Sequence, residues 1–284
     1  MKRETSTYNF DDEGRFEIRN YNWSKPVSSF LPGIAGIWGV PSWCYFVNRG
    51  QLVCSLGVED KDGAILEFIS FNQALTQVEQ TGFRTFIRMD DKVYEPFKKA
   101  GSRQANQILR ISPHELEIEE QNQAFGLNTH VLYFPLVELP LAGLVRVVQI
   151  TNTQKEACTI DIIDGVARLI PYGTSFEHQK VTARHIEALM QVTEISGVPV
   201  FKLKQTADDI SEIGEIAGGH FMISQRLRGE IHPQGTIVDP RVVFGGTDQL
   251  GIPWAFQAEE LRELLAVKQM RANQTPCAFS AWSA

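Results

Sequence analysis

The sequence predicts a mainly β protein, a large antiparallel β-sandwich with a few helices, notably near residues 176–192 and 256–271. The first reason is a long series of short segments rich in β-branched and aromatic residues over residues 1–200. The second is that turn-forming residues separate these segments at close spacing, which is typical of antiparallel sheets. The third is size: 284 residues, 43% of them hydrophobic, allow a substantial buried core.

The expected strands begin with residues 16–19, which alternate between apolar and charged side chains. Residues 51–58 and 64–71 are expected to pair as a hairpin, because the Asp62-Gly63 step between them suits a tight turn with positive φ. Further strands are expected at residues 82–89, 92–97, 107–111, 115–121, 125–135, 144–152 and 158–165.

Two segments have helical spacing instead. In residues 175–192, Ser175 is a plausible N-cap, and apolar residues recur so that they share one helical face. In residues 256–271, leucines cluster and the acidic residues lie in the first half, which suits a helix N-terminus. We therefore expect a sandwich domain over residues 1–255 and a helical segment over 256–284.

The charge balance narrows the possible partners. The net charge is −7, the sequence pI is about 5.5, and no basic stripe is present, which argues against nucleic acid and anionic membranes as main partners. No apolar run approaches the roughly 20 residues of a membrane span, and the first fifteen residues lack the apolar region of a signal peptide. A cytoplasmic location is expected.

The cysteine pattern also fits a cytoplasmic location. Cys44, Cys54, Cys158 and Cys277 are scattered, without metal-ligand spacing, so no metal site is expected. Cys44 and Cys54 could face each other across a hairpin and form a disulfide, but free buried thiols suit a reducing compartment better.

Residues 28–51 are the strongest candidate for a binding surface. Their glycines, prolines and tryptophans are incompatible with a regular helix and predict a strand pair broken by a turn. Flat rings beside hydrogen-bonding groups are suited to holding sugars, whereas a core hairpin with its aromatic rings inside is the alternative. The expected sugar-contacting side chains are Trp38, Trp43, Tyr45, Asn48 and Arg49, with Arg84 and Arg88 behind them.

Arg84 and Arg88 share one face of their expected strand with Phe86, because strand side chains alternate. That face is either a polar ligand wall or a solvated sheet surface. No catalytic constellation is visible elsewhere. His178 and His185 are seven residues apart, which is wider than the spacing of a helical metal-binding pair. A glycosidase-type reaction needs a carboxylic acid, but no sequence motif singles out any of the candidates, which are Asp164, Glu177, Asp208, Asp209, Asp239 and Asp248. No catalytic residue is therefore predicted.

Several blocks of the sequence nevertheless stand out together. They are Ser29-Phe-Leu-Pro-Gly-Ile-Ala-Gly-Ile-Trp-Gly-Val-Pro, Tyr45-Phe-Val-Asn-Arg-Gly-Gln, Gly82-Phe-Arg-Thr-Phe, Asp164-Gly-Val-Ala-Arg-Leu-Ile-Pro-Tyr-Gly, Ile237-Val-Asp-Pro-Arg-Val-Val-Phe-Gly and Pro276-Cys-Ala-Phe. In this order they resemble the N-terminal region of inverting glycoside phosphorylases of the cellobiose phosphorylase family. The long members that act on β-linked oligoglucans are the most similar.

The resemblance implies an N-terminal supersandwich-like β domain, a helical connection and then an (α/α)6 barrel that holds the general acid and most phosphate-binding residues. It also implies a homodimer, a β-linked oligosaccharide as substrate, and inorganic phosphate as co-substrate with no other cofactor. The sequence ends before any such barrel, so this chain is expected to be an N-terminal part without turnover of its own. A non-catalytic carbohydrate-binding or assembly module is the alternative.

Overall fold

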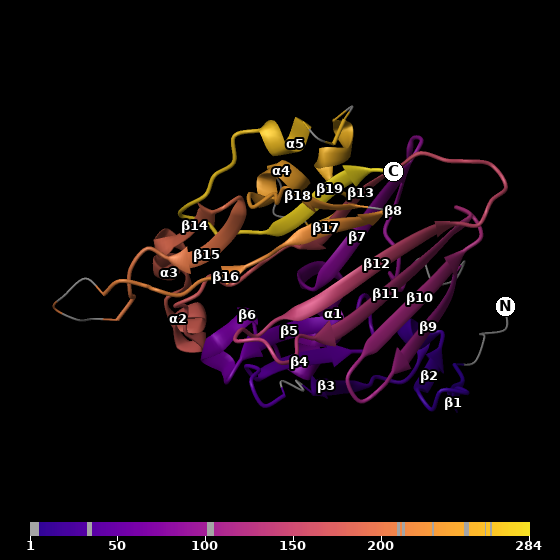
Figure 1. Cartoon of the computed structure of the whole chain (residues 1–284), viewed down its shortest axis with the longest axis horizontal. Helices are drawn as coiled ribbons and strands as arrows, with labels where there is room; N and C mark the ends of the chain where they lie inside the picture. Colours follow the sequence, from indigo (N-terminus) through magenta and orange to yellow (C-terminus); the bar gives the residue numbers. More distant parts are fainter. Residues whose placement is uncertain are drawn as a thin grey trace. The chain divides into compact units, whose positions relative to one another are not determined.

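The structure, a computed structural model, describes residues 6–32, 36–100, 105–208, 211, 214–228, 230–246, 250–258, 260–261 and 263–284. The chain forms two compact units (Figure 1). Unit 1 comprises Met1–Glu59, Ile69–Glu79 and Glu95–Cys158, and unit 2 comprises Asp60–Phe68, Gln80–Tyr94 and Thr159–Ala284. The fold class is the predicted one, because antiparallel strands dominate and the helices are few and short.

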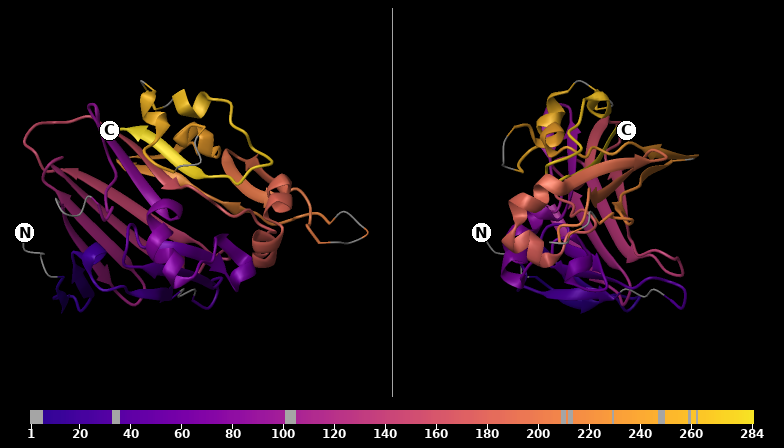
Figure 2. Two further views of the ribbon diagram at one scale, coloured as in Figure 1. Left: turned by 180° about the vertical axis from the view of Figure 1, so that it is seen from behind. Right: turned by 90° about the vertical axis from the view of Figure 1, so that its left-hand side faces the viewer.

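Unit 1 is built on a six-stranded antiparallel sheet, visible from two sides in Figures 1 and 2. Side chains alternate between a buried and a more exposed face along β10 and β11, as strand geometry requires. The strand order is β1 (Tyr8–Phe10), β2 (Phe16–Arg19), β9 (Ala105–Ile111), β10 (Leu116–Asn122), β11 (Leu127–Pro135) and β12 (Leu144–Asn152).

The second sheet of unit 1 contains β3 (Ser28–Pro32), β4 (Ser42–Val47) and β5 (Val53–Val58). β3 and β4 pair with Phe30 opposite Tyr45, which confirms the strand pair predicted for residues 28–51. A short 3-10 helix, η1 (Tyr21–Trp23), precedes β3.

Helix α1 (Phe71–Thr81) packs on this sheet and was not predicted. Ala74 and Val78 share a core cluster with Tyr45. The expected strand over residues 64–71 is shorter, β6 (Ala64–Leu66), because a helix start follows. Ser70 donates from its backbone N–H and its hydroxyl to Gln73 Oε1, at 3.3 and 3.0 Å, and this Ser-x-x-Gln spacing is the signal that was missed.

A buried polar layer lies inside unit 1. Glu120 Oε2 accepts hydrogen bonds from the backbone N–H of Phe97, at 2.7 Å, and from Gln107 Nε2. Asn22 donates to Gln107 Oε1 at 2.7 Å and accepts from the N–H of Gly50 at 2.9 Å. Burial raises the pKa of Glu120 to about 8, so this carboxyl is largely protonated at neutral pH.

Unit 2 contains a four-stranded antiparallel sheet and two smaller ones. The four-stranded sheet has the order β19 (Ala278–Ser283), β13 (Ile160–Val166), β7 (Phe83–Met89) and β8 (Lys92–Tyr94). The others are β14 (Met190–Ile195), β15 (Val198–Leu203) and β16 (His220–Phe221), and the hairpin of β17 (Ser224–Arg228) and β18 (Glu230–Gln234). β13 and β19 approach closely at Gly165, where a Cβ would lie 2.0 Å from the carbonyl oxygen of Ala278.

The helices of unit 2 are short. Their bounds are η2 (Lys61–Gly63), α2 (Phe176–Val181), α3 (Ala183–Leu189), α4 (Pro240–Phe244), η4 (Trp254–Gln257) and α5 (Glu263–Ala266). Ser175 caps α2 as predicted, since its hydroxyl accepts from the N–H of His178 at 3.1 Å. The single helix predicted over residues 175–192 is wrong, because the helix is interrupted at Thr182 and residues 190–192 lie in β14.

The continuous helix predicted over residues 256–271 is wrong. The described residues there form only two four-residue pieces, η4 and α5. Beyond them the chain is held from the side: Gln269 Oε1 accepts from the N–H of Val238, and the N–H of Met270 donates to Asp239. The chain then continues into β19, so residues 256–284 belong to unit 2 by their contacts and end in a strand.

All four cysteines are free, so Cys44 and Cys54 form no disulfide. Both are buried, and burial raises the pKa of the Cys54 thiol to about 12. Among the described residues, no helix is both long enough and apolar enough to cross a membrane.

In unit 2, the buried Oγ of Ser280 in β19 has no hydrogen-bond partner among the described residues. A buried polar group without a partner loses its hydration without compensation. We therefore expect Ser280→Ala to raise the free energy of unfolding by about 0.5–1 kcal/mol. Urea unfolding measures this change. A free energy of unfolding that falls by more than about 1 kcal/mol in Ser280→Ala would mean that the Ser280 hydroxyl does form a hydrogen bond.

Candidate functional site

The loop between β3 and β4 presents Trp38 to solvent. Trp38 is 77% exposed, and the neighbouring Ile37 is 86% exposed. Glu138, from the loop between β11 and β12, accepts hydrogen bonds from the backbone N–H groups of Ile37 and Trp38, each at 3.1 Å. Gly36 has φ of +77°, and a Cβ there would lie 2.1 Å from Glu138 Oε1, so glycine permits this anchor.

The two other aromatic side chains predicted on this hairpin are less exposed. Trp43 is half-buried, and Tyr45 is buried with its ring 5.0 Å from that of Phe30. Tyr45 also belongs to the core beneath α1. Of the three predicted rings, Trp38 is therefore the one that a ligand in solvent reaches most freely.

Asn48 and Arg49 are buried, and their side chains bind the backbone near η1. Asn48 Nδ2 donates to the hydroxyl of Ser24 at 2.6 Å, and its Oδ1 accepts from the N–H of Val27 at 2.8 Å. Arg49 donates to the carbonyl oxygens of Tyr21 and Ser24, at 3.2 and 3.0 Å. These contacts hold the turn between β4 and β5, and the structure does not bring them to the surface beside Trp38.

Arg84 and Arg88 lie in unit 2, on β7. Arg84 is 1% exposed, and its guanidinium lies 4.5 Å from the Phe86 ring and donates to the carbonyl oxygen of Leu250. Arg88 pairs with Asp161 and donates to the carbonyl oxygens of Phe256 and, at 3.0 Å, of Ala258. The face they share is thus neither solvated nor open to ligand, because both arginines fasten the segment 250–258.

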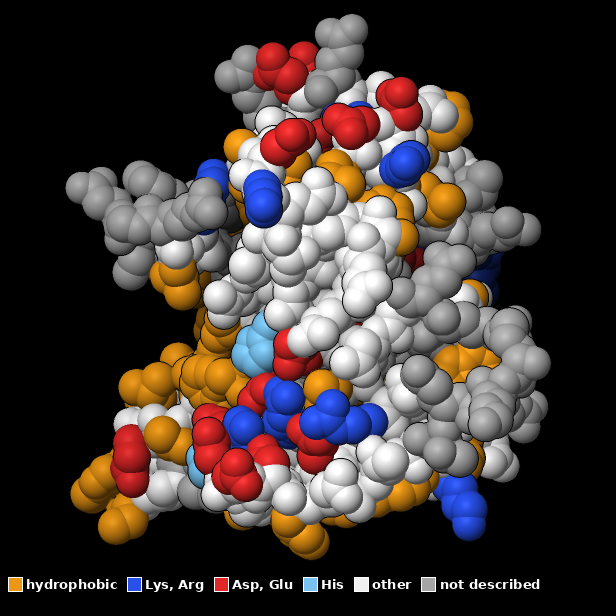
Figure 3. Space-filling model, turned by 90° about the vertical axis from the view of Figure 1, so that its right-hand side faces the viewer, with side chains coloured by type: hydrophobic (Ala, Val, Ile, Leu, Met, Phe, Trp, Pro, Cys, Tyr) orange, Lys and Arg blue, Asp and Glu red, His pale blue; other side chains and the backbone are white. Residues whose placement is uncertain are grey.

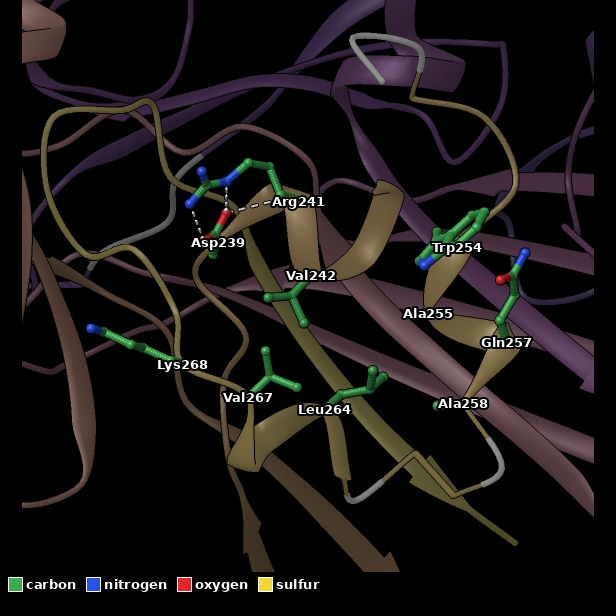
Figure 4. A pocket seen from close by; sticks show the side chains of 10 residues that line it. All are labelled: Asp239, Arg241, Val242, Trp254, Ala255, Gln257, Ala258, Leu264, Val267 and Lys268. Atoms are coloured by element: carbon green, nitrogen blue, oxygen red, sulfur yellow. Dashed lines mark hydrogen bonds and ion pairs between the residues drawn. The ribbon is translucent and has the colours of Figure 1, made fainter. Parts of the chain in front are cut away.

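That segment forms one wall of a pocket in unit 2 with a volume of about 600 Å³ (Figure 4). η4 contributes Trp254, which is 58% exposed, together with Gln257. α4 and the residue before it contribute Asp239, Arg241 and Val242. Ala255, Ala258, Leu264, Val267 and Lys268 complete the lining.

Charge in the pocket centres on Asp239. Its carboxylate accepts from Arg241 Nε at 3.0 Å and Nη2 at 2.7 Å, and from the N–H of Met270 at 2.8 Å. Burial alone raises the pKa of Asp239, but the hydrogen bonds from Arg241 and Met270 outweigh it and hold the pKa below its usual value. Asp239 is therefore an ionised structural partner of Arg241 and a poor general acid.

The other candidate carboxylates that the structure describes do not come together as a catalytic group. Asp164 accepts from the hydroxyl of Thr85 at 2.7 Å, Asp208 accepts from Thr206 at 2.8 Å, and Glu177 is exposed. Asp209 and Asp248 lie outside the described residues. Over the described part of the chain, no three His, Cys, Asp or Glu side chains gather as a metal site would require.

Mixed charges gather on the face drawn in Figure 3, where Lys and Arg side chains lie among Asp and Glu. In unit 1, Arg110 pairs with Glu17 at 3.1 Å and with Glu117, which is also 3.2 Å from His130. The hydrogen bond from His130, together with Arg110, lowers the pKa of Glu117 to about 2. These opposite charges satisfy one another, so we assign them a structural role.

Among the described residues, the Trp38 loop of unit 1 and the pocket of unit 2 are therefore both open to a ligand. The sequence indicated the first, while the second depends on contacts between segments distant in sequence. Compared with models of known protein families and with curated protein sequences, the chain matches none.

Proposed function

We propose that this chain is the N-terminal, non-catalytic part of a cytoplasmic, homodimeric inverting glycoside phosphorylase that acts on β-linked glucan oligosaccharides. The proposal starts from the six sequence blocks that resemble this family. The mainly antiparallel β fold is the one the resemblance implies for this region.

The exposed and anchored Trp38 carries the proposal. Large aromatic side chains are usually buried, so an indole that is 77% exposed suggests a contact with something outside the molecule. The Glu138 hydrogen bonds hold the backbone of the loop, which lowers the entropy lost when a ligand binds. A flat indole face suits the apolar face of a glucosyl ring.

The packing of unit 2 adds support. Four resemblance-bearing blocks lie in this unit, and all of them contribute to one core cluster. Their members in that cluster are Phe86, Ala167, Ile237, Val243, Phe244, Cys277 and Phe279. These distinctive blocks therefore form one packed body, as expected for a domain that supports a neighbouring barrel.

In the reaction that the proposal implies, inorganic phosphate attacks the anomeric carbon, and the configuration inverts. The glycosidic bond breaks, the leaving oxygen takes a proton from an acid in the barrel, and the products are α-glucose 1-phosphate and a shortened oligosaccharide. The Trp38 loop would contact the oligosaccharide at the rim, and no catalytic step is assigned to this chain.

The first test is oligosaccharide binding by the chain. We expect laminari-, cello- or sopho-oligosaccharides to bind, and Trp38→Ala to weaken binding about five- to tenfold, the worth of one aromatic contact. Trp23→Ala is the matched control, because Trp23 is a 40% exposed tryptophan of the same unit, and it should leave binding unchanged. Equal binding by the wild type and Trp38→Ala, measured by calorimetry, would refute the role of Trp38.

A further inference from the structure

We propose that the pocket of unit 2 binds a small amphiphilic anion, a compound with a flat or aliphatic apolar body and one carboxylate or phosphate group. The site is separate from the Trp38 loop, so this inference does not rest on the proposed function. It rests on the lining of the pocket, its charges and the way its walls are held.

The pocket has the size and the apolar lining of a small-molecule site. Its volume of about 600 Å³ lies within the range of roughly 300–1,000 Å³ of ligand pockets. Six of the ten lining side chains are apolar or aromatic: Val242, Trp254, Ala255, Ala258, Leu264 and Val267. A purely polar ligand would leave this surface without a partner, so the ligand needs an apolar body.

The two ends of the pocket differ in chemistry (Figure 4). Trp254 and Gln257 lie at one end, whereas the Asp239–Arg241 pair and Lys268 lie at the other, with Val242 and Leu264 between them. An apolar body can therefore rest between the indole and the aliphatic side chains while a charged group reaches the opposite end.

That charged group is an anion. Asp239 is already bonded to Arg241, so its negative charge is balanced within the lining. Lys268 is exposed and takes part in no ion pair among the described residues, which leaves the lining one positive charge in excess. Lysine and the outer edge of an arginine are suitable partners for carboxylate and phosphate oxygens.

The pocket wall is fixed rather than loose. Arg84 and Arg88 bind carbonyl oxygens on both sides of Trp254. The backbone of Gly245 lies against Trp254, since a Cβ at Gly245 would lie 3.3 Å from two Trp254 atoms. These contacts hold the backbone that carries Trp254 before a ligand arrives, which favours binding.

The test uses phenyl phosphate and phenylacetate as probes, with benzyl alcohol and inorganic phosphate as the neutral and the non-apolar comparison. Binding is followed by the ¹H–¹⁵N signal of the Trp254 indole, assigned by its loss in Trp254→Phe. We expect at least one aromatic anion to shift this signal with an affinity at least tenfold higher than either comparison compound. Tighter binding of phenyl phosphate would indicate a phosphate ligand, and tighter binding of phenylacetate would indicate a carboxylate ligand.

Lys268→Glu should weaken this binding at least tenfold, whereas Lys155→Glu, an exposed lysine of unit 1, should change it less than twofold. Both variants replace exposed lysines, so folding is retained and the comparison stays valid. The proposal is overturned by no shift at roughly 10 mM of either anion. Equal affinity for benzyl alcohol or inorganic phosphate, or equal effects of the two lysine variants, would also overturn it.

Discussion

Arg84→Met is expected to lower the free energy of unfolding by about 2–4 kcal/mol. Arg84 is 1% exposed, and its guanidinium binds the carbonyl oxygen of Leu250 and, at 3.4 Å, that of Gly251. Methionine fills much of the volume but donates no hydrogen bond. These carbonyl groups would therefore lose their partner in the interior, which is the main cost. Urea unfolding followed by circular dichroism measures the change.

Two comparisons make this result specific. Arg184→Met is the control, because the Arg184 side chain is 97% exposed, and its effect should stay within about 0.5 kcal/mol. Limited proteolysis of Arg84→Met should also cut within residues 250–258 faster than in the wild type, since Arg84 fastens that segment. A stable Arg84→Met with unchanged cleavage would contradict the anchoring role.

We expect the free energy of unfolding to fall as the pH rises from about 4.5 to about 8, because Glu120 is buried. Burial raises the pKa of Glu120 from 4.5 to about 8, so between these values the folded state binds a proton that the unfolded state has released. The contribution of protonated Glu120 to the free energy of unfolding is fully present below pH 4.5 and is lost progressively as the pH rises to about 8. The difference between these two pKa values corresponds to roughly 5 kcal/mol.

Glu120→Gln isolates this contribution, because glutamine mimics the protonated carboxyl and keeps an oxygen for the N–H of Phe97. The variant should match the wild type within about 1 kcal/mol at pH 5 and exceed it by several kcal/mol at pH 9. Glu156→Gln, at an exposed site of the same unit, should differ little at either pH. Equal pH dependence in wild type and Glu120→Gln would show that Glu120 ionises normally.

The strands could be predicted because burial of one sheet face imposes a two-residue period. Residues 125–135 were predicted as a strand, and in β11 (Leu127–Pro135) buried and less buried side chains alternate with this period. Helix α1 was missed because the apolar run before it reads as a strand, and only the Ser70–Gln73 capping pair marks the change. The helix predicted over residues 256–271 does not form as one piece, because tertiary contacts override the local helix propensity. Gln269 binds the backbone of Val238, and the backbone of Met270 binds Asp239.

The candidate sites were less predictable than the strands. Trp38 was identified correctly as part of a turn-containing hairpin, but sequence alone gave no sign of the Glu138 anchor about a hundred residues away. Asn48 and Arg49 have the chemistry of ligand-binding groups, yet they bind backbone carbonyls near η1. The pocket escaped prediction because its wall depends on the pairing of Arg84 and Arg88 with residues some 170 positions away.

Phosphorolysis by the whole protein encoded by the gene is the decisive measurement for the proposal that this chain serves a phosphorylase of β-linked glucans. The protein is mixed with inorganic phosphate and laminari-, cello- or sopho-oligosaccharides, and glucose 1-phosphate is measured. We expect release by the whole protein, none by residues 1–284 alone, and a raised KM with Trp38→Ala. Oligosaccharide binding without any glucose 1-phosphate from the whole protein would contradict the claim and indicate a carbohydrate-binding module instead.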